Sequence, residues 1–226
     1  MTERLRIPVP AADMTVSARL DGDPSCSPLL VFGHGAGAGI DHPLQQLIVR
    51  SFVAAGIAVL RYQFPFMERK GGVGFGRDPL PLAVTTVRAA FGHGRDLAGS
   101  DGLLAGGHSY GGRISSHAAL DGGLEGARGL VLLSFPLQPR RRSARGDRSG
   151  HLGAVGLPML FVSGDRDPMA PTPALEDKVA ALERAECVRI PGADHGWRAP
   201  QRLHPDGPTD AVAAAVAAWI ERLQPA

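Results

Sequence analysis

The sequence predicts an α/β fold with a mostly parallel, doubly wound sheet, and two observations lead to this class. Short apolar runs with few polar interruptions recur along the chain, which is typical of strands buried on both faces of a parallel sheet. Segments with apolar residues at helical spacing lie between these runs. Strands that alternate with helices indicate βαβ units, whose helices cover both faces of the sheet.

The predicted elements follow one another in a simple order. The apolar runs predict strands at residues 29–33, 57–62, 102–107, 129–135, 158–164 and 186–192. Helical spacing predicts helices around residues 44–52, 84–91 and 212–223. The first 20 residues indicate a short hairpin added at one edge of the sheet.

The length limits the number of domains. Two packed domains would be cramped in 226 residues, so we expect a single domain over residues 1–226. No segment between the predicted strands is long enough for a separate cap domain, so we expect the cap to be minimal or absent.

The composition is that of a globular protein. Hydrophobic residues make up 44% of the chain and charged residues 20%, and no run reaches the roughly 18 apolar residues of a membrane helix. The N-terminus lacks the apolar stretch of a secretory signal, so we expect a cytoplasmic protein without membrane contact. Cys26 and Cys187 lie far apart and outside any CxxC pattern, which indicates free thiols rather than a disulfide or a metal site.

One arginine-rich segment accounts for most of the basic character. Residues 140–148 carry five Arg and one Asp, and no basic stripe with interleaved aromatic residues occurs elsewhere, so we expect no nucleic-acid partner. The longer segment 139–153 connects two predicted strands and should pass beside the site that their ends form. It is therefore predicted either to steer anionic substrates, as a lid-like loop, or to be a solvated loop without a role.

A GxSxG motif lies where an apolar strand meets a helix. Residues 107–111 read GHSYG directly after the strand 102–107, which is the context of a nucleophile elbow with Ser109 at its tip. The elbow forces a strained backbone at Ser109, and Gly107 and Gly111 permit the strand and the helix to approach closely. The motif predicts a serine nucleophile.

Candidate partners of Ser109 follow it in the order of an α/β hydrolase. The strand 158–164 is followed by Asp165 and Asp167, and the strand 186–192 is followed by His195. A histidine there can take the serine proton and return it to the leaving group, while a carboxylate fixes its tautomer. The spacing leaves both aspartates open as the acid.

A glycine-rich loop completes the predicted site. GHGAGAG at 33–39 follows the first parallel strand, where such folds place a loop that stabilises the oxyanion of a tetrahedral intermediate. We assign the oxyanion hole to the backbone N–H groups of Ala36 and Tyr110. His34 is expected to orient the loop at the edge of the substrate pocket. The other side chains predicted to line this pocket are Phe64, Phe66, Met67, Leu137 and Trp197.

Several motifs together resemble a known family. They are HGAG at 34–37, LRYQFPFMERK at 60–70, GGHSYGGR at 106–113, SFPL at 134–137, LFVSGDRDP at 160–168 and GADHGW at 192–197. In combination they resemble the small dienelactone-hydrolase-like α/β hydrolases that include the testis-expressed and NSL-complex-subunit-like proteins. The resemblance implies an α/β-hydrolase fold over about residues 28–222 and places the acid at Asp167. Dienelactone hydrolases proper use a cysteine nucleophile, whereas this chain has Ser109.

These observations predict a serine hydrolase that cleaves a carboxylic ester or thioester of a small molecule through an acyl-enzyme, without metal or cofactor. Two alternatives remain open. GHGAGA at 33–38 also fits a dinucleotide-binding loop, with Arg61 as the partner of a 2′-phosphate. The second alternative is a noncatalytic interaction module on the same fold. Such a module needs none of Ser109, Asp167 and His195.

Overall fold

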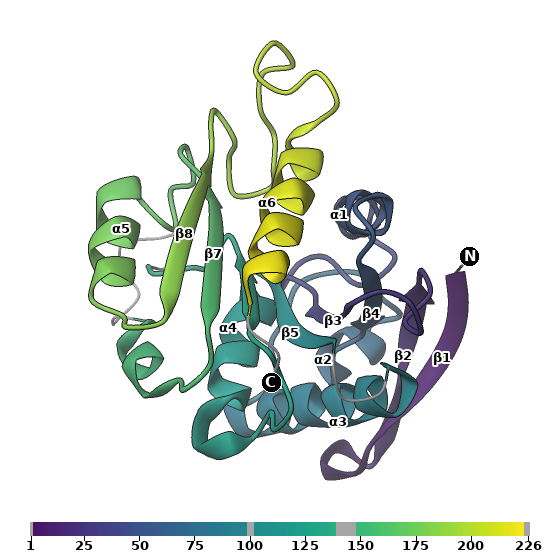
Figure 1. The fold of residues 1–226 in the computed structure, drawn as a ribbon. Coiled ribbons are helices and arrows are strands. Elements are labelled where there is room, and N and C mark those ends of the chain that lie inside the picture. Colours follow the sequence, from purple (N-terminus) through teal and green to yellow (C-terminus); the bar gives the residue numbers. More distant parts are fainter. Residues whose placement is uncertain (1, 99–101, 139–147, 224–226) are drawn as a thin grey trace.

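The computed structural model describes residues 2–98, 102–138 and 148–223, and they form one eight-stranded sheet with helices on both faces (Figure 1). The strands are β1 (Thr2–Val9), β2 (Met14–Asp21), β3 (Leu29–Gly33), β4 (Ala58–Tyr62), β5 (Leu103–His108), β6 (Leu130–Leu133), β7 (Met159–Gly164) and β8 (Ala185–Ile190). Their order across the sheet is β1-β2-β4-β3-β5-β6-β7-β8. The strands from β4 to β8 run parallel, so the predicted fold class is confirmed.

The N-terminal hairpin lies at one edge of the sheet, as the sequence predicts. β1 pairs with β2 in antiparallel register, and β2 pairs in the same sense with β4. The hairpin therefore adds an antiparallel edge to a parallel sheet.

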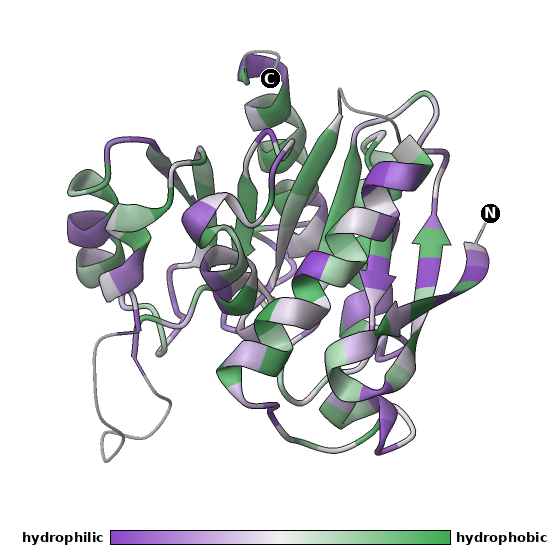
Figure 2. Cartoon of the chain, turned by 90° about the horizontal axis from the view of Figure 1, so that it is seen from below, coloured by the Kyte–Doolittle hydropathy of each residue, from purple (hydrophilic) through white to green (hydrophobic). Residues whose placement is uncertain are grey.

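The sheet separates the core into two parts, and helices cover each of them. The helices are α1 (Pro43–Ala54), α2 (Pro65–Glu68), α3 (Leu80–Ala98), α4 (Tyr110–Ala118), α5 (Thr172–Ala180) and α6 (Pro208–Arg222). Buried side chains of α1 and α6 pack on one face of the sheet, and those of α3, α4 and α5 pack on the other (Figure 1). Successive strand residues alternate between these two faces. For this reason the central strands are largely apolar, and Figure 2 shows them mostly in green.

Two helices and one strand differ from the sequence prediction. The short helices α2 and α5 were not predicted, because each begins at prolines and carries little apolar periodicity. β8 is half exposed, since it is the outer strand of the sheet and pairs with β7 alone. No helix in the described part of the chain is long and apolar enough to cross a membrane.

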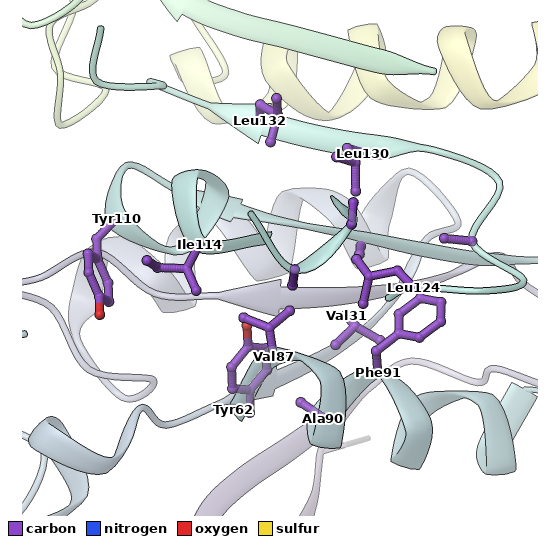
Figure 3. Packing of buried hydrophobic residues seen from close by; sticks show 14 of the residues in the cluster. Val31, Tyr62, Val87, Ala90, Phe91, Tyr110, Ile114, Leu124, Leu130 and Leu132 are labelled. Carbon is purple, nitrogen blue, oxygen red and sulfur yellow. The ribbon is translucent and has the colours of Figure 1, made fainter. Parts of the chain in front are cut away.

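The order of the strands determines where a site can form. In an open α/β sheet, ligands bind outside the carboxyl ends of the parallel strands. Here the carboxyl ends of β3, β5, β7 and β8 lead into the loops that carry the motifs predicted from the sequence. Tyr110, the first residue of α4, lies at one end of the core cluster that the sheet shares with α3 and α4 (Figure 3).

Candidate active site

Ser109 is the single residue between a strand and a helix, and its backbone conformation is strained. β5 ends at His108 and α4 begins at Tyr110, and the φ and ψ angles of Ser109 are 53° and −107°. A positive φ is unfavourable for a residue with a Cβ atom, and it persists only where the surrounding structure imposes it. The turn thereby holds the half-buried Ser109 side chain at the carboxyl end of the sheet.

The glycines around Ser109 are required by close backbone contacts. A Cβ atom on Gly107 would lie 2.5 Å from the carbonyl oxygen of Gly33, and one on Gly111 would lie 2.1 Å from the same oxygen. Both distances are far below van der Waals contact. Only glycine at these positions lets β3 and the start of α4 pack against the elbow.

Ser109, His195 and Asp167 form a continuous hydrogen-bonded chain. The Nε2 atom of His195 lies 3.0 Å from the Ser109 Oγ, and its Nδ1 atom lies 2.7 Å from an Asp167 carboxylate oxygen. Because the carboxylate accepts from Nδ1–H, Nε2 is left unprotonated and can accept the hydrogen bond of the Ser109 hydroxyl. The three residues come from the ends of β5, β7 and β8.

Asp167 is held in place at its other oxygen. The Asp167 side chain has no exposed surface, whereas that of His195 is 25% exposed. The second carboxylate oxygen of Asp167 accepts a hydrogen bond of 2.8 Å from the Met169 N–H. The buried acid therefore has a partner on each oxygen and a fixed orientation towards the imidazole.

Asp165 has a different partner. Its carboxylate accepts a hydrogen bond of 2.7 Å from the Gly192 N–H, which ties the turn after β7 to the turn after β8. The structure thus brings Asp167, and not Asp165, against His195.

The proposed oxyanion donors are free to bind a ligand. Among the described residues, neither the Ala36 N–H nor the Tyr110 N–H has a hydrogen-bond partner. Tyr110 is also the first residue of α4, where the helix dipole favours a negative charge.

His34 is a neutral imidazole in the loop between β3 and α1, residues 34–42, which we call the oxyanion loop. Its Nδ1 atom lies 2.7 Å from the Gly35 carbonyl oxygen, and its Nε2 atom accepts a hydrogen bond of 3.0 Å from the Phe64 N–H. One ring nitrogen must donate and the other must accept, so the ring carries a single proton. Burial lowers the pKa of His34 to about 4, in agreement with this arrangement.

A second set of contacts fixes the far end of the oxyanion loop. The Ile40 N–H donates to the Gln63 side-chain oxygen at 3.0 Å, and the Ile40 carbonyl accepts from Arg61. Arg61 is 7% exposed and forms an ion pair of 2.8 Å with Asp21. The guanidinium of Arg61 thus bonds Ile40 and Asp21. This contradicts the dinucleotide interpretation, in which Arg61 binds a 2′-phosphate.

His108 contacts the candidate catalytic histidine, and the sequence analysis missed it. Its Nε2 atom lies 2.9 Å from the His195 carbonyl oxygen, and a carbonyl can only accept, so Nε2 carries the proton. Burial, with the nearby His195 as a smaller cause, lowers the pKa of His108 to about 4. The signal in the sequence was its position directly before Ser109 in the motif.

The predicted pocket side chains are mostly enclosed in the core. Phe64, Phe66 and Met67 are at most 5% exposed, and Phe64 and Phe66 pack against His34 and Tyr110 with ring centroids 5.0 to 5.8 Å apart. These side chains are part of the core packing next to His34 and Tyr110, and their role in a substrate pocket stays a prediction.

The remaining pocket candidates differ in exposure. Trp197 is 3% exposed and packs with α6 on the opposite face of the sheet, and His34 is fully buried, so neither lines an open pocket. Leu137 is half-buried and remains a candidate. Most of the arginine-rich segment, residues 139–147, lies outside the described residues, so its predicted role as a lid-like loop stays a prediction.

A cavity of about 490 Å³ lies beside the oxyanion loop. It is bounded by Gly37 and Ile40 of that loop, by Gln63, and by the glycine-rich segment 71–74. Ser109 and His195 do not line it. The cavity therefore adjoins the loop that would bind the oxyanion without opening onto the nucleophile.

The fold and the arrangement of Ser109, His195 and Asp167 are those of an α/β hydrolase. The chain belongs to the alpha/beta hydrolase domain family, whose model matches residues 27–221. Among curated proteins, none matches the sequence.

Solved structures similar to this chain include three hydrolases. Dienelactone hydrolase from Anabaena variabilis has a TM-score of 0.72 at 19% identity, with 99% of this chain and 98% of that chain covered. Est1E from Butyrivibrio proteoclasticus has a TM-score of 0.71 at 18% identity, with 96% and 97% covered. XC6422 from Xanthomonas campestris, an α/β serine hydrolase without lid, has a TM-score of 0.70 at 22% identity, with 98% and 94% covered. At identities this low, the structural similarity shows that the fold is shared and shows nothing about substrates.

Proposed function

We propose that this protein is a serine hydrolase that cleaves a carboxylic ester or thioester of a small molecule through an acyl-enzyme. The observation that carries the proposal is the hydrogen-bonded chain from Ser109 through His195 to Asp167 at a strained elbow. No structural role requires a strained serine, a tautomer-fixed histidine and a buried acid in one line. Strain of this kind is stored mainly at functional sites.

The first half of the reaction acylates Ser109. As Ser109 Oγ attacks the acyl carbonyl carbon, Nε2 of His195 takes its proton and the carbonyl electrons move to the oxygen. The resulting oxyanion is stabilised by the N–H groups of Ala36 and Tyr110. The intermediate collapses, the bond to the leaving oxygen or sulfur breaks, and His195 returns the proton to the leaving group.

The second half releases the acid. A water molecule gives a proton to His195 and attacks the acyl carbon. The second tetrahedral intermediate collapses with the Ser109 Oγ as its leaving group, and His195 returns the proton to that oxygen. Asp167 stays ionised throughout and stabilises the imidazolium that forms in each half. The chain's own residues supply every proton transfer in this scheme.

We place the chain, on its motifs, with the testis-expressed and NSL-complex-subunit-like group of small dienelactone-hydrolase-like proteins, and we propose that it acts in the cytoplasm. GGHSYGGR at 106–113 and GADHGW at 192–197 support this grouping. Both motifs contain residues of the proposed site.

The experiment is ester hydrolysis by the full chain and by Ser109→Ala, with short p-nitrophenyl esters and acyl thioesters as substrates. Loss of Ser109 removes the nucleophile, so we expect turnover to fall by about 10³-fold or more with the fold unchanged by circular dichroism. Ser163→Ala is the matched control, because the Ser163 hydroxyl is buried near the same strand ends without a hydrogen-bond partner among the described residues. A wild-type protein that hydrolyses no ester in the panel, or a fully active Ser109→Ala, would favour the noncatalytic interaction module.

A further inference from the structure

Arg113 lies one helical turn after the candidate nucleophile, and no carboxylate among the described residues forms an ion pair with it. Its N–H donates to the Ser109 carbonyl at 3.1 Å, and helical side chains lean towards the N-terminus of their helix, which here is the nucleophile elbow. The side chain is half-buried, and its Nε–H is fully buried without a hydrogen-bond partner in the described part of the chain. A buried donor of this kind needs an acceptor.

Arg77 is an exposed residue in the segment between α2 and α3. Gly76, beside it, donates its N–H to the Ala36 carbonyl at 3.1 Å, which attaches this segment to the oxyanion loop. The Arg77 guanidinium lies 5.7 Å from the centre of the Phe75 ring, and a Cβ atom on Gly37 would lie 3.4 Å from that ring. Arg77 is therefore held next to the loop that would bind the oxyanion.

Arg148 approaches from the segment that follows β6. Its N–H donates to the Leu137 carbonyl at 3.4 Å. The positive charge of Arg77 lowers the pKa of Arg113, and the charges of Arg77 and Arg113 both lower the pKa of Arg148, in each case after burial as the larger cause. Three guanidinium groups from three separate segments thus lie within electrostatic reach of one another.

No carboxylate in the described residues neutralises this cluster. Asp78, the neighbour of Arg77, is the acidic group at hand, but its oxygens accept from Arg69 at 2.7 Å and from the Phe66 N–H at 3.0 Å. The half-buried Arg113 and Arg148 and the exposed Arg77 have no ion pair among the described residues. The other buried or half-buried arginines there, Arg19, Arg61 and Arg128, each have an ion pair or bond a carbonyl. Like charges held together without a counter-ion attract an anion.

We propose that Arg77, Arg113 and Arg148 form a subsite that binds an anionic oxygen group, a carboxylate or a phosphate, on the substrate whose acyl carbonyl reacts with Ser109. The inference rests on the proposed function. Guanidinium groups suit this ligand because they offer parallel donors to two oxygens and stay charged when partly buried. The substrate class becomes an ester or thioester with a negative charge near the reacting bond.

The test compares two ethyl esters that differ in one group. Ethyl hexanoate ends in a methyl group where monoethyl adipate ends in a carboxylate, and a pH-stat measures hydrolysis of both. We expect the wild type to prefer monoethyl adipate, with a kcat/KM that falls as salt is added. In Arg113→Gln and Arg77→Gln, kcat/KM for the adipate ester should fall by about tenfold more than for the hexanoate ester, mainly through KM, because a charge-assisted hydrogen bond is lost. Arg77→Lys should recover part of the preference.

Arg189→Gln is the matched control, since Arg189 pairs with Glu176 on the β8 side and should leave the preference unchanged. Competition by propionate or by ethyl phosphate assigns the anion as carboxylate or phosphate. Equal use of both esters by the wild type, with no competition by either anion, would overturn the subsite. Failure of the wild type to hydrolyse any ester would instead overturn the proposed function.

Discussion

The two aspartates after β7 are only two residues apart, yet one has a structural partner and the other contacts the candidate catalytic histidine. Asp165 bonds the Gly192 N–H, and Asp167 bonds the His195 imidazole. Each carboxylate faces a different neighbour because the turn between them reverses the chain. The residue type alone therefore does not tell which aspartate is the acid.

Asp167→Asn and Asp165→Asn should therefore differ in kind. Loss of the Asp167 carboxylate permits the wrong His195 tautomer and should lower kcat by about 10⁴-fold at nearly unchanged stability. Asp165→Asn keeps an oxygen that accepts from Gly192 and should cost about 1 kcal/mol of unfolding free energy with activity retained. Urea titration and ester kinetics on both variants measure the contrast. An inactive Asp165→Asn beside an active Asp167→Asn would assign the acid to the wrong aspartate.

At the scale of elements, the oxyanion loop is fixed at both ends by hydrogen bonds to β4 and the residues that follow it. His34 bonds the Phe64 N–H at one end, and Gln63 and Arg61 hold the backbone of Ile40 at the other. An oxyanion hole is effective when its donors are already in place before the reaction. The hydrogen bonds of β4 and of the residues that follow it thus serve the geometry of Ala36.

Gln63→Met should loosen this loop. The substitution leaves the buried Ile40 N–H without its acceptor, which should cost about 1 to 3 kcal/mol of stability. We expect kcat to fall by about tenfold or more while KM changes little, since the transition state depends on the oxyanion donors. Gln63→Glu restores an acceptor and should recover kcat. If KM rises and kcat stays constant in Gln63→Met, the clamp serves substrate binding instead.

The elements also show what a sequence can and cannot reveal. Apolar runs predicted the strands well, since strands covered on both faces must be apolar throughout. Phe64, Met67 and Trp197 were expected at the pocket because they neighbour the site in sequence, but adjacency does not reveal which face a side chain takes. The position of His108 before Ser109 was a signal, but its partner His195 lies 87 positions further on. Arg77, Arg113 and Arg148 left no pattern, because they lie more than 30 positions apart.

At the scale of the whole molecule, two buried histidines couple stability to pH. His34 and His108 have pKa values lowered from 6.5 to about 4, in both cases mainly by burial. Below pH 6.5 the unfolded chain binds protons that the folded chain does not. Stability contributed by the neutral rings is therefore complete above pH 6.5 and is lost progressively as the pH falls towards 4.

Urea unfolding at pH 7, 6 and 5 should show this loss. Each histidine is expected to lower the unfolding free energy by about 1.4 kcal/mol per pH unit once the pH is below 6.5. His34→Asn and His108→Asn should each flatten the dependence, whatever their stability at pH 7. Slopes in both variants that run parallel to the wild type would mean that neither buried ring titrates in this window.

The central claim is that Ser109 is a nucleophile activated by His195 and Asp167. The most direct measurement is reaction of the full chain with a fluorophosphonate, followed by digestion and mass spectrometry to locate the adduct. We predict a single adduct on the peptide that contains Ser109, formed at a rate that falls by about 10³-fold or more in His195→Gln. An adduct on another residue, no adduct in the folded wild type, or the same rate in His195→Gln would contradict the account.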